Sequence, residues 1–218
     1  MVDDATLELT WYGHAMFKTA GSGRTIVIDP VPPQVGYRYD PIPADVVLMT
    51  HGHFDHTYMD GVSGNPRTIS TAGTFEVDGL AVTGYEGFHD AKGGQERGPV
   101  VIFSWEQAGL KLAHFGDLGD RPTEETMRNL KGLDIAMMPV GSVYTVDAAG
   151  ALDLVSELAP SIVIPMHYGT PDCVIPLDRV EEFTGKFGGA TRLIEQRPLT
   201  VSRADIPDAT EVWVLPYL

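Results

Sequence analysis

The first half of the chain alternates short apolar runs with glycine, proline and acidic residues. Short runs with turn residues on both sides predict β-strands rather than helices. The segment 20–24, Ala-Gly-Ser-Gly-Arg, predicts a hairpin turn, and the proline-rich segment 31–43 predicts a loop. The strands predicted in this half are 7–12, 15–19, 25–29, 46–49, 68–71, 74–77, 80–85, 100–105 and 110–114.

The second half alternates helical periodicity with apolar runs. Thr123 followed by Glu125 predicts the start of a helix that ends near residue 130, and Asp147 predicts the N-cap of a helix over 148–158. A third helix is predicted over 177–187, ended by the glycine pair 188–189. The intervening strands are 135–140, 161–165, 192–195 and 211–215. Strands first, then alternating strands and helices, predict the α/β class.

Composition sets the scale of the fold and its compartment. The chain has 218 residues, 43% of them apolar, and a mean hydropathy of −0.03, which is typical of a globular protein with a substantial core. No shift in composition marks a linker, so we expect a single domain over residues 1–218. The start of the chain is acidic and lacks a signal-peptide pattern, and Cys173 is the single cysteine. These features predict a cytoplasmic location.

The formal net charge of −15 limits the partners. Binding to nucleic acid or to an anionic membrane surface normally needs a basic face, so neither is expected. The acidic surface is explained by solubility, with a high-salt habitat as the alternative. A small-molecule substrate is the expected partner, and self-association into a homo-oligomer stays open.

Potential metal ligands follow several predicted strands. His51, His53, Asp55 and His56 come directly after the apolar run 46–49. Imidazole nitrogens combined with a carboxylate suit zinc, manganese, iron or nickel better than calcium. Other strand ends carry His89, Asp117 and His167. The sequence therefore predicts a site for metal, with two ions expected.

The order of these residues resembles the metallo-β-lactamase superfamily, whose signature is H-x-H-x-D-H followed by a histidine, an aspartate and a final histidine. The resemblance implies an αββα sandwich, with two mixed sheets flanked by helices. It implies that His51, His53 and His89 hold one ion, that Asp55, His56 and His167 hold the second, and that Asp117 bridges them. Segments 11–15, 116–119, 139–145 and 164–168 resemble the branch that includes ascorbate 6-phosphate lactonase and small uncharacterised hydrolases.

The resemblance implies hydrolysis of a small ester, lactone or phosphoester, which can be anionic, by a hydroxide bridging two divalent ions. The ions are expected to be Zn²⁺, with Mn²⁺, Fe²⁺ or Ni²⁺ as alternatives. Asp55 would also orient the hydroxide and transfer a proton. His14 would either donate to a substrate oxygen or orient a ligand. The alternatives are an iron-dependent redox enzyme on the same fold and a non-catalytic metal-binding or sensor protein.

Several nearby residues have two interpretations each. Asp29 either accepts a hydrogen bond from a metal-binding histidine or caps a turn. His114 is expected to pack or hydrogen-bond below the site, because an odd spacing places it and Asp117 on opposite faces of a strand. Tyr144 and Thr145 either line the cleft or pack within their loop. Asp90 is expected to support the site or to be solvated, and Cys173 to be a small buried hydrophobe.

Overall fold

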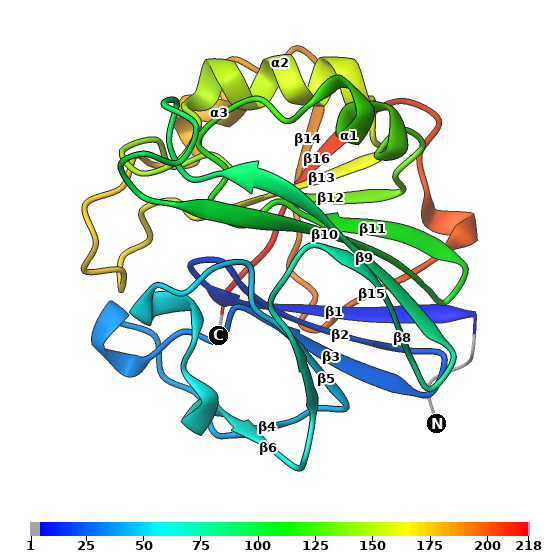
Figure 1. The fold of residues 1–218 in the computed structure, drawn as a ribbon. Helices are drawn as coiled ribbons and strands as arrows, with labels where there is room; N and C mark the ends of the chain where they lie inside the picture. Colours follow the sequence, from blue (N-terminus) through cyan, green and yellow to red (C-terminus); the bar gives the residue numbers. More distant parts are fainter. Residues whose placement is uncertain (1–4, 218) are drawn as a thin grey trace.

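Two large β-sheets pack face to face, and the three α-helices of the described residues lie on the outer face of one of these sheets (Figure 1). The computed structural model describes residues 5–217. The six-stranded sheet has the order β15 (Leu199–Ser202), β1 (Thr6–Gly13), β2 (Met16–Gly21), β3 (Arg24–Ile28), β5 (Val46–Leu48), β7 (Arg67–Ile69). The eight-stranded sheet has the order β14 (Ala190–Leu193), β16 (Glu211–Val214), β13 (Ile162–Met166), β12 (Ile135–Pro139), β11 (Leu110–His114), β10 (Pro99–Gln107), β9 (Leu80–Phe88), β8 (Gly73–Val77).

The length of each connection explains why both sheets are mixed. Tight turns join β1, β2 and β3, and also β8 to β9 and β10 to β11, so these neighbours are antiparallel. The loop 89–98 between β9 and β10 is longer, and these two strands are antiparallel as well. Longer connections allow parallel neighbours, as in β3 to β5 and β5 to β7. Helices α1 (Glu124–Asn129) and α2 (Ala148–Leu158) link β11, β12 and β13, which are parallel. The prediction of a sandwich of two mixed sheets is confirmed.

The predicted starts of the first two helices are confirmed by their caps. The Thr126 backbone N–H donates to Thr123 Oγ1 at 3.2 Å, and the Gly150 N–H donates to Asp147 Oδ1 at 2.8 Å. The third helix, α3 (Glu181–Thr184), is much shorter than the predicted 177–187.

The shortening of α3 has a visible cause in the backbone around Asp178. Its N–H donates to Gly141 O at 3.0 Å, and its carbonyl accepts from Gly169 N at 2.8 Å. Asp178 is therefore bonded to two other loops, and the helical hydrogen bonds begin only at the carbonyls of Arg179 and Val180. Periodicity alone could not reveal these long-range bonds.

The outer face of the six-stranded sheet is covered differently from the prediction of flanking helices. In the part of the chain that the structure describes, this cover contains no α-helix. It consists of 3₁₀ turns and the small sheet of β4 (Ile42–Pro43) and β6 (Val62–Ser63). Tyr37 and Val35 pack there against Met16 and Val27. The predicted loop 31–43 is thus largely irregular, but it is packed and contributes to the core.

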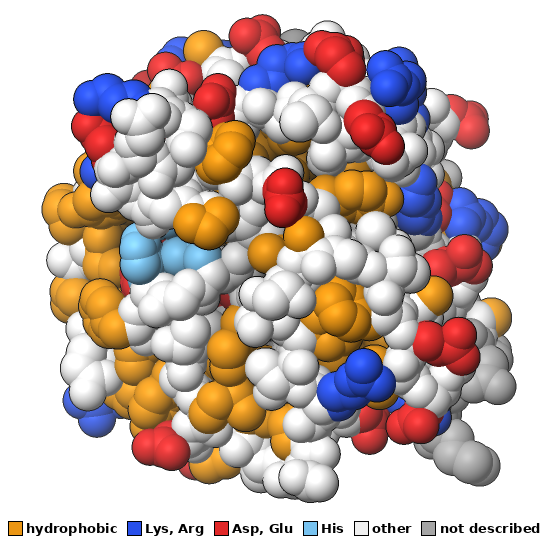
Figure 2. Space-filling model, viewed as in Figure 1, with side chains coloured by type: hydrophobic (Ala, Val, Ile, Leu, Met, Phe, Trp, Pro, Cys, Tyr) orange, Lys and Arg blue, Asp and Glu red, His pale blue; other side chains and the backbone are white. Residues whose placement is uncertain are grey.

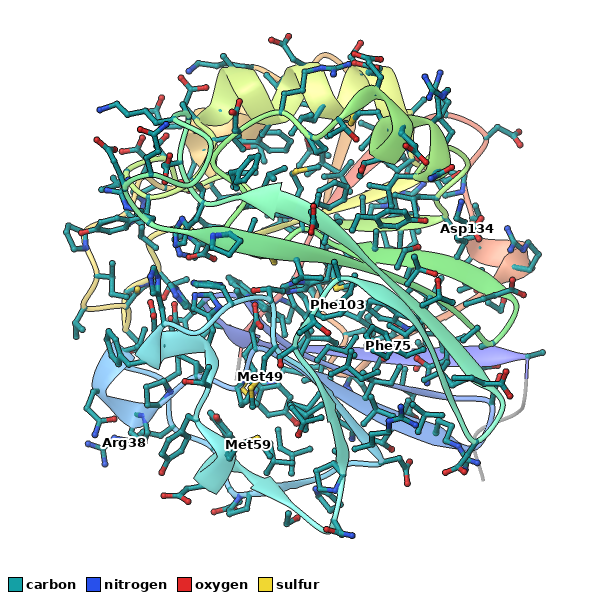
Figure 3. The ribbon with its side chains drawn as sticks, viewed as in Figure 1. Arg38, Met49, Met59, Phe75, Phe103 and Asp134 are labelled. Atoms are coloured by element: carbon teal, nitrogen blue, oxygen red, sulfur yellow. The ribbon has the colours of Figure 1, made fainter. Side chains whose placement is uncertain are left out.

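The main core lies between the sheets and continues under the helices. Phe103 of β10 is fully buried and extends between the two sheets (Figure 3). The sequence analysis missed β15, a four-residue strand beside β1, although the run 199–202 alternates apolar with polar residues as a half-buried strand does. Within the described residues, no helix is long and apolar enough to cross a bilayer.

Shortening a side chain in the core should lower the stability of the fold. We expect Phe103→Ala to lower the free energy of unfolding by about 3–5 kcal/mol, because it leaves a cavity between the sheets. Leu193→Ala is the control, since Leu193 is 79% exposed and its truncation should have little effect. Urea unfolding followed by circular dichroism measures both, and equal destabilisation would contradict the assigned core.

Candidate metal centre

The seven histidines of the chain gather at one end of the sandwich, where loops from both sheets meet. Figure 2 shows histidine in a hollow at the left edge, bordered by hydrophobic side chains. Four ligand candidates follow β5, and the others follow the ends of β9, β11 and β13. His14 lies in the turn between β1 and β2. The structure therefore brings together all the residues that the sequence predicted for the site.

His51, His53 and His89 form one group, in which one ring nitrogen of each lies within 4.8 Å of the others. Their ring centroids are 4.6 to 4.9 Å apart. The Thr50 hydroxyl lies 3.0 Å from His51 Nδ1, and the buried His51 Nε2 atom has no hydrogen-bond partner among residues 5–217. Burial lowers the pKa of His51 to about 3, and the neighbouring His56 adds to this effect. The neutral ring therefore offers a free lone pair for a metal ion.

His56, Asp117 and His167 form a second group together with His14. Asp55 lies at its edge: Asp55 Oδ2 is 3.8 Å from His56 Nε2 and 3.1 Å from His14 Nε2. The cluster thus contains His14 in addition to the predicted residues, while the carboxylate of Asp55 is engaged by His14. The role of Asp55 as a ligand stays a prediction.

Asp117 lies between the two groups and is 2% exposed. Its Oδ2 atom is 3.0 Å from His167 Nε2, 3.2 Å from His56 Nε2, 3.4 Å from His89 Nε2 and 3.9 Å from His51 Nε2. Burial raises the pKa of Asp117, but the nearby His167 and His56 outweigh it and hold the pKa well below its usual range. The carboxylate is therefore ionised.

These contacts fit a divalent metal. Ligands that share a tetrahedral ion at about 2.1 Å lie about 3.4 Å from one another, which is the spacing around Asp117. His56 Nε2 and Asp117 Oδ1 are buried and have no hydrogen-bond partner among the described residues, although buried polar atoms normally have one. Imidazole nitrogens and a carboxylate are the donors that zinc and its neighbours prefer. The residues present thus suit metal ions better than a metal-free hydrogen-bond network.

Asp29, which follows β3, supports His56 on the side away from Asp117. Its fully buried carboxylate lies 3.0 Å from His56 Nδ1 and accepts hydrogen bonds of 2.7 Å from both the backbone N–H and the hydroxyl of Thr50. The contact directs the other nitrogen of His56 toward Asp117. Burial raises the pKa of Asp29, but the charge and hydrogen bond of His56 outweigh it and lower the pKa. Of its two interpretations, the hydrogen bond to a candidate ligand is the one observed.

The backbone at the site is strained. His14, Asp29 and His167 have φ values of 52°, 47° and 53°, in the left-handed region that side chains other than glycine rarely adopt. Such residues cost about 1–3 kcal/mol each and persist where surrounding structure requires them. Two hydrogen bonds hold the backbone of His14 in this conformation. Its carbonyl oxygen accepts from Trp11 Nε1 at 3.0 Å and from the His167 N–H at 2.9 Å.

Two glycines let other loops approach the candidate ligands. A Cβ atom on Gly119 would lie 2.4 Å from the carbonyl carbon of His89, and one on Gly141 would lie 1.9 Å from the carbonyl oxygen of His167. Any side chain at either position would displace a ligand-bearing backbone. The sequence analysis did not identify this role, since a close approach between distant segments leaves no local pattern.

His114 is a structural residue, as predicted. It is fully buried, its Nε2 donates to Ala15 O at 2.8 Å, and its Nδ1 accepts from Gly116 N at 3.1 Å. It thereby fixes the turn next to His14. Cys173 is half-buried, with Sγ 3.7 Å from Ile175 O, and packs at the edge of the outer core.

Asp90 is buried, so the interpretation as a solvated residue is wrong. Its carboxylate accepts four backbone hydrogen bonds of 2.8 to 3.1 Å, from residues 92, 94, 96 and 97. Burial raises the pKa of Asp90, but these N–H donors outweigh it and hold the pKa below its usual range. Asp90 therefore fixes the conformation of the loop that follows His89.

A cleft of about 610 Å³ opens beside Asp117. Tyr144 lines it, whereas the Thr145 hydroxyl lies 3.1 Å from Val146 O and 3.3 Å from Ser142 O and so finds its acceptor within its own loop. The sequence analysis missed Arg97 and the apolar part of this lining; a lone arginine in the glycine-rich loop after His89 was the one available signal. The cleft is lined by Gly52, His53, Phe54, Asp55, His89, Arg97, Asp117, Tyr144, His167, Val174, Ile175 and Pro176.

Removal of the support below His56 should weaken metal binding. We expect Asp29→Ala to lower zinc affinity by about 10- to 100-fold, because His56 loses the carboxylate that orients its ring. Competition with a chromophoric chelator measures the affinity. Asp45→Ala is the control, since Asp45 is exposed and accepts a hydrogen bond from Thr25 N near the other end of β3. An unchanged affinity in a folded Asp29→Ala protein would show that this contact does not support the metal site.

Comparison with known proteins agrees with this geometry. The family model described as "Beta-lactamase superfamily domain" matches residues 8–167. A metal-dependent hydrolase of the UPF0173 family from Methanopyrus kandleri is 30% identical over 199 residues, covering 75% of this chain and 85% of the relative. A second one, from Methanoculleus marisnigri, is 32% identical over 189 residues, covering 75% of this chain and 82% of the relative.

Among solved structures, the chain is similar to a proposed zinc-dependent hydrolase of the metallo-β-lactamase superfamily from Thermotoga maritima. The TM-score is 0.79 at 29% identity, and the match covers 97% of this chain and all of the other. The matched segment contains every candidate metal ligand from His51 to His167. The chain therefore belongs to the metallo-β-lactamase superfamily and, within it, to the UPF0173 family of metal-dependent hydrolases.

Proposed function

We propose that this protein hydrolyses a small ester, lactone or phosphoester with the help of two divalent metal ions, of which zinc is the first candidate. The observation that carries the proposal is the pair of ligand groups around Asp117 at the floor of one open cleft. When bound there, two divalent ions would supply a nucleophilic hydroxide near neutral pH and polarise the bond to be cleaved.

The occupancy by two ions is supported by how the ligands divide. His51, His53 and His89 are sufficient for one ion, and His56 and His167 lie in the second group. Asp117 has its Oδ2 atom close to members of both. Three protein ligands with an open position are typical of catalytic rather than structural zinc sites.

Asp55 is proposed to orient the attacking water and accept its proton, and His14 is proposed to hold Asp55 in place. His14 is fully buried, and burial lowers its pKa to about 4, with repulsion from His167 adding to the effect. The neutral ring donates its Nε2 proton to Asp55 Oδ2. Burial raises the pKa of Asp55, but the hydrogen bond from His14 and the charge of His56 outweigh it and lower the pKa. An ionised Asp55 can thus accept a hydrogen bond from the water and orient it.

We propose the following bond changes. The water oxygen bonds to the acyl carbon or phosphorus, the bond to the leaving oxygen breaks, and the proton passes through Asp55 to that oxygen. His14 is buried beneath Asp55 and does not line the cleft. Of its two predicted roles, orienting another residue is the one that the structure supports.

The number of metal ions can be measured directly. We expect the wild-type protein to bind about two zinc ions per chain, and His53→Ala and His167→Ala each to bind about one, because each variant removes a ligand from a different group. Inductively coupled plasma mass spectrometry after dialysis gives the ratio, and Asp60→Asn is the control at an exposed site nearby. Saturation of the wild-type protein at one ion would contradict the dinuclear proposal.

Catalysis should depend on Asp55. On a panel of chromogenic esters, lactones and phosphoesters, we expect Asp55→Asn to lower kcat by on the order of a hundredfold to ten-thousandfold, since the amide cannot take a proton. Asp60→Asn changes the charge equally and should retain the wild-type rate. Oxygen uptake by the iron-loaded protein, without hydrolysis of any member of the panel, would instead favour the redox alternative.

A further inference from the structure

Arg97 differs in charge from the other residues that line the cleft. Among the described residues that line it, Arg97 is the one cationic side chain apart from the histidines, while Asp55 and Asp117 are anionic. The chain as a whole has 15 lysines and arginines against 30 acidic residues. An unpaired cation next to a catalytic centre in such an acidic protein requires an explanation.

The backbone that carries Arg97 is held rigidly. The Asp90 carboxylate accepts hydrogen bonds from Arg97 N at 2.8 Å and from Glu96 N at 3.0 Å, and Asp90 directly follows His89. The loop is closed again by His89 N donating to Gly98 O at 3.1 Å. The position of Arg97 is thus coupled through a few residues to a candidate metal ligand.

The guanidinium group of Arg97 contacts the Tyr144 ring, but no carboxylate of the described residues neutralises its charge. Its Cζ atom lies 5.2 Å from the centre of the Tyr144 ring, a geometry typical of a cation–π contact. Stacking leaves the N–H groups at the edge of the guanidinium plane free to donate. Within the described chain, these N–H groups make no hydrogen bond or ion pair.

The wall of the cleft beyond this cation is apolar. Phe54 and Val174 are 67% and 68% exposed, and Ile175 and Pro176 lie next to Val174. Large exposed hydrophobic side chains around a cleft indicate contact with an apolar ligand group. One cation and an apolar wall beside the metal centre together fit an amphipathic molecule.

We propose that Arg97 is a specificity residue that binds an oxyanion, carboxylate or phosphate, on the substrate. The apolar part of the same substrate packs against Phe54 and Val174, with the scissile bond beside Asp117. A planar guanidinium pairs with such oxyanions through two parallel N–H···O bonds, which a lysine cannot reproduce. The inference rests on the proposed hydrolytic function and narrows its substrates to molecules that carry both an oxyanion and an apolar group.

A pair of esters with the same leaving group tests the inference by activity. Mono(para-nitrophenyl) glutarate carries a carboxylate, and para-nitrophenyl pentanoate is its neutral counterpart of equal chain length. With the zinc-loaded protein we expect Arg97→Gln to raise KM for the glutarate ester by about tenfold or more, and to leave kcat/KM for the pentanoate ester within twofold. Arg97→Lys should recover only part of the loss.

Arg38→Gln is the matched control. Arg38 is exposed, lies outside the cleft and points away from the protein in Figure 3, so its loss changes the net charge equally. Arg38→Gln should leave KM and kcat/KM for both esters unchanged. The proposal would be overturned if Arg97→Gln lowered kcat/KM equally for both esters, or if Arg38→Gln had the same effect as Arg97→Gln. The metal content of each variant, measured in parallel, shows whether the metal centre is intact.

A binding measurement separates this inference from the proposed function. Calorimetric titration with pentanoate, butyl phosphate and neutral butanol reports on Arg97 without turnover. Weaker binding of an anion to Arg97→Gln, by about tenfold, supports the inference even if no ester is cleaved, and the anion affected shows whether carboxylate or phosphate is preferred. Unchanged binding of both anions would overturn it, whether or not the wild-type protein is a hydrolase.

Discussion

The structure depends on one buried carboxylate. Asp117 follows β11 of one sheet, and the imidazoles of His51 and His56 reach it from the other sheet, so the contact exists only when the two sheets pack in this relative position. His89 and His167 approach the same oxygen from their own loops. The imidazoles around Asp117 favour its ionised form, and divalent ions between these ligands would stabilise the buried charge further. Folding and metal binding are therefore expected to be coupled.

The surrounding residues serve to hold these side chains in place. Asp29 orients His56 from below, and His114 fixes the turn at Ala15 beside His14. The left-handed backbone at His14, Asp29 and His167 is maintained by the bonds around it. Strain of this kind concentrates at functional sites, where rigid placement of ligands matters more than the local backbone energy.

The loops at the rim of the cleft belong to the same rigid network. Asp90 ties the loop of Arg97 to His89, and Asp178 ties the segment before α3 to Gly141 and Gly169, on either side of His167. The residues that would select a substrate are thus connected to the residues that would hold metal. The rim of the cleft and the candidate ligands are therefore held by the same set of backbone and side-chain bonds.

The sequence by itself predicted most of the strands, the caps of α1 and α2, and the histidines that the structure gathers around Asp117. Local patterns suffice for these features because strand ends and helix caps depend on neighbouring residues. Tertiary structure alone decided the short α3, the support role of Asp90, the close approaches at Gly119 and Gly141, and the position of Arg97 over Tyr144. Each of these depends on segments far apart in the chain, whose contacts are set by the packing of the two sheets and leave no periodic signal.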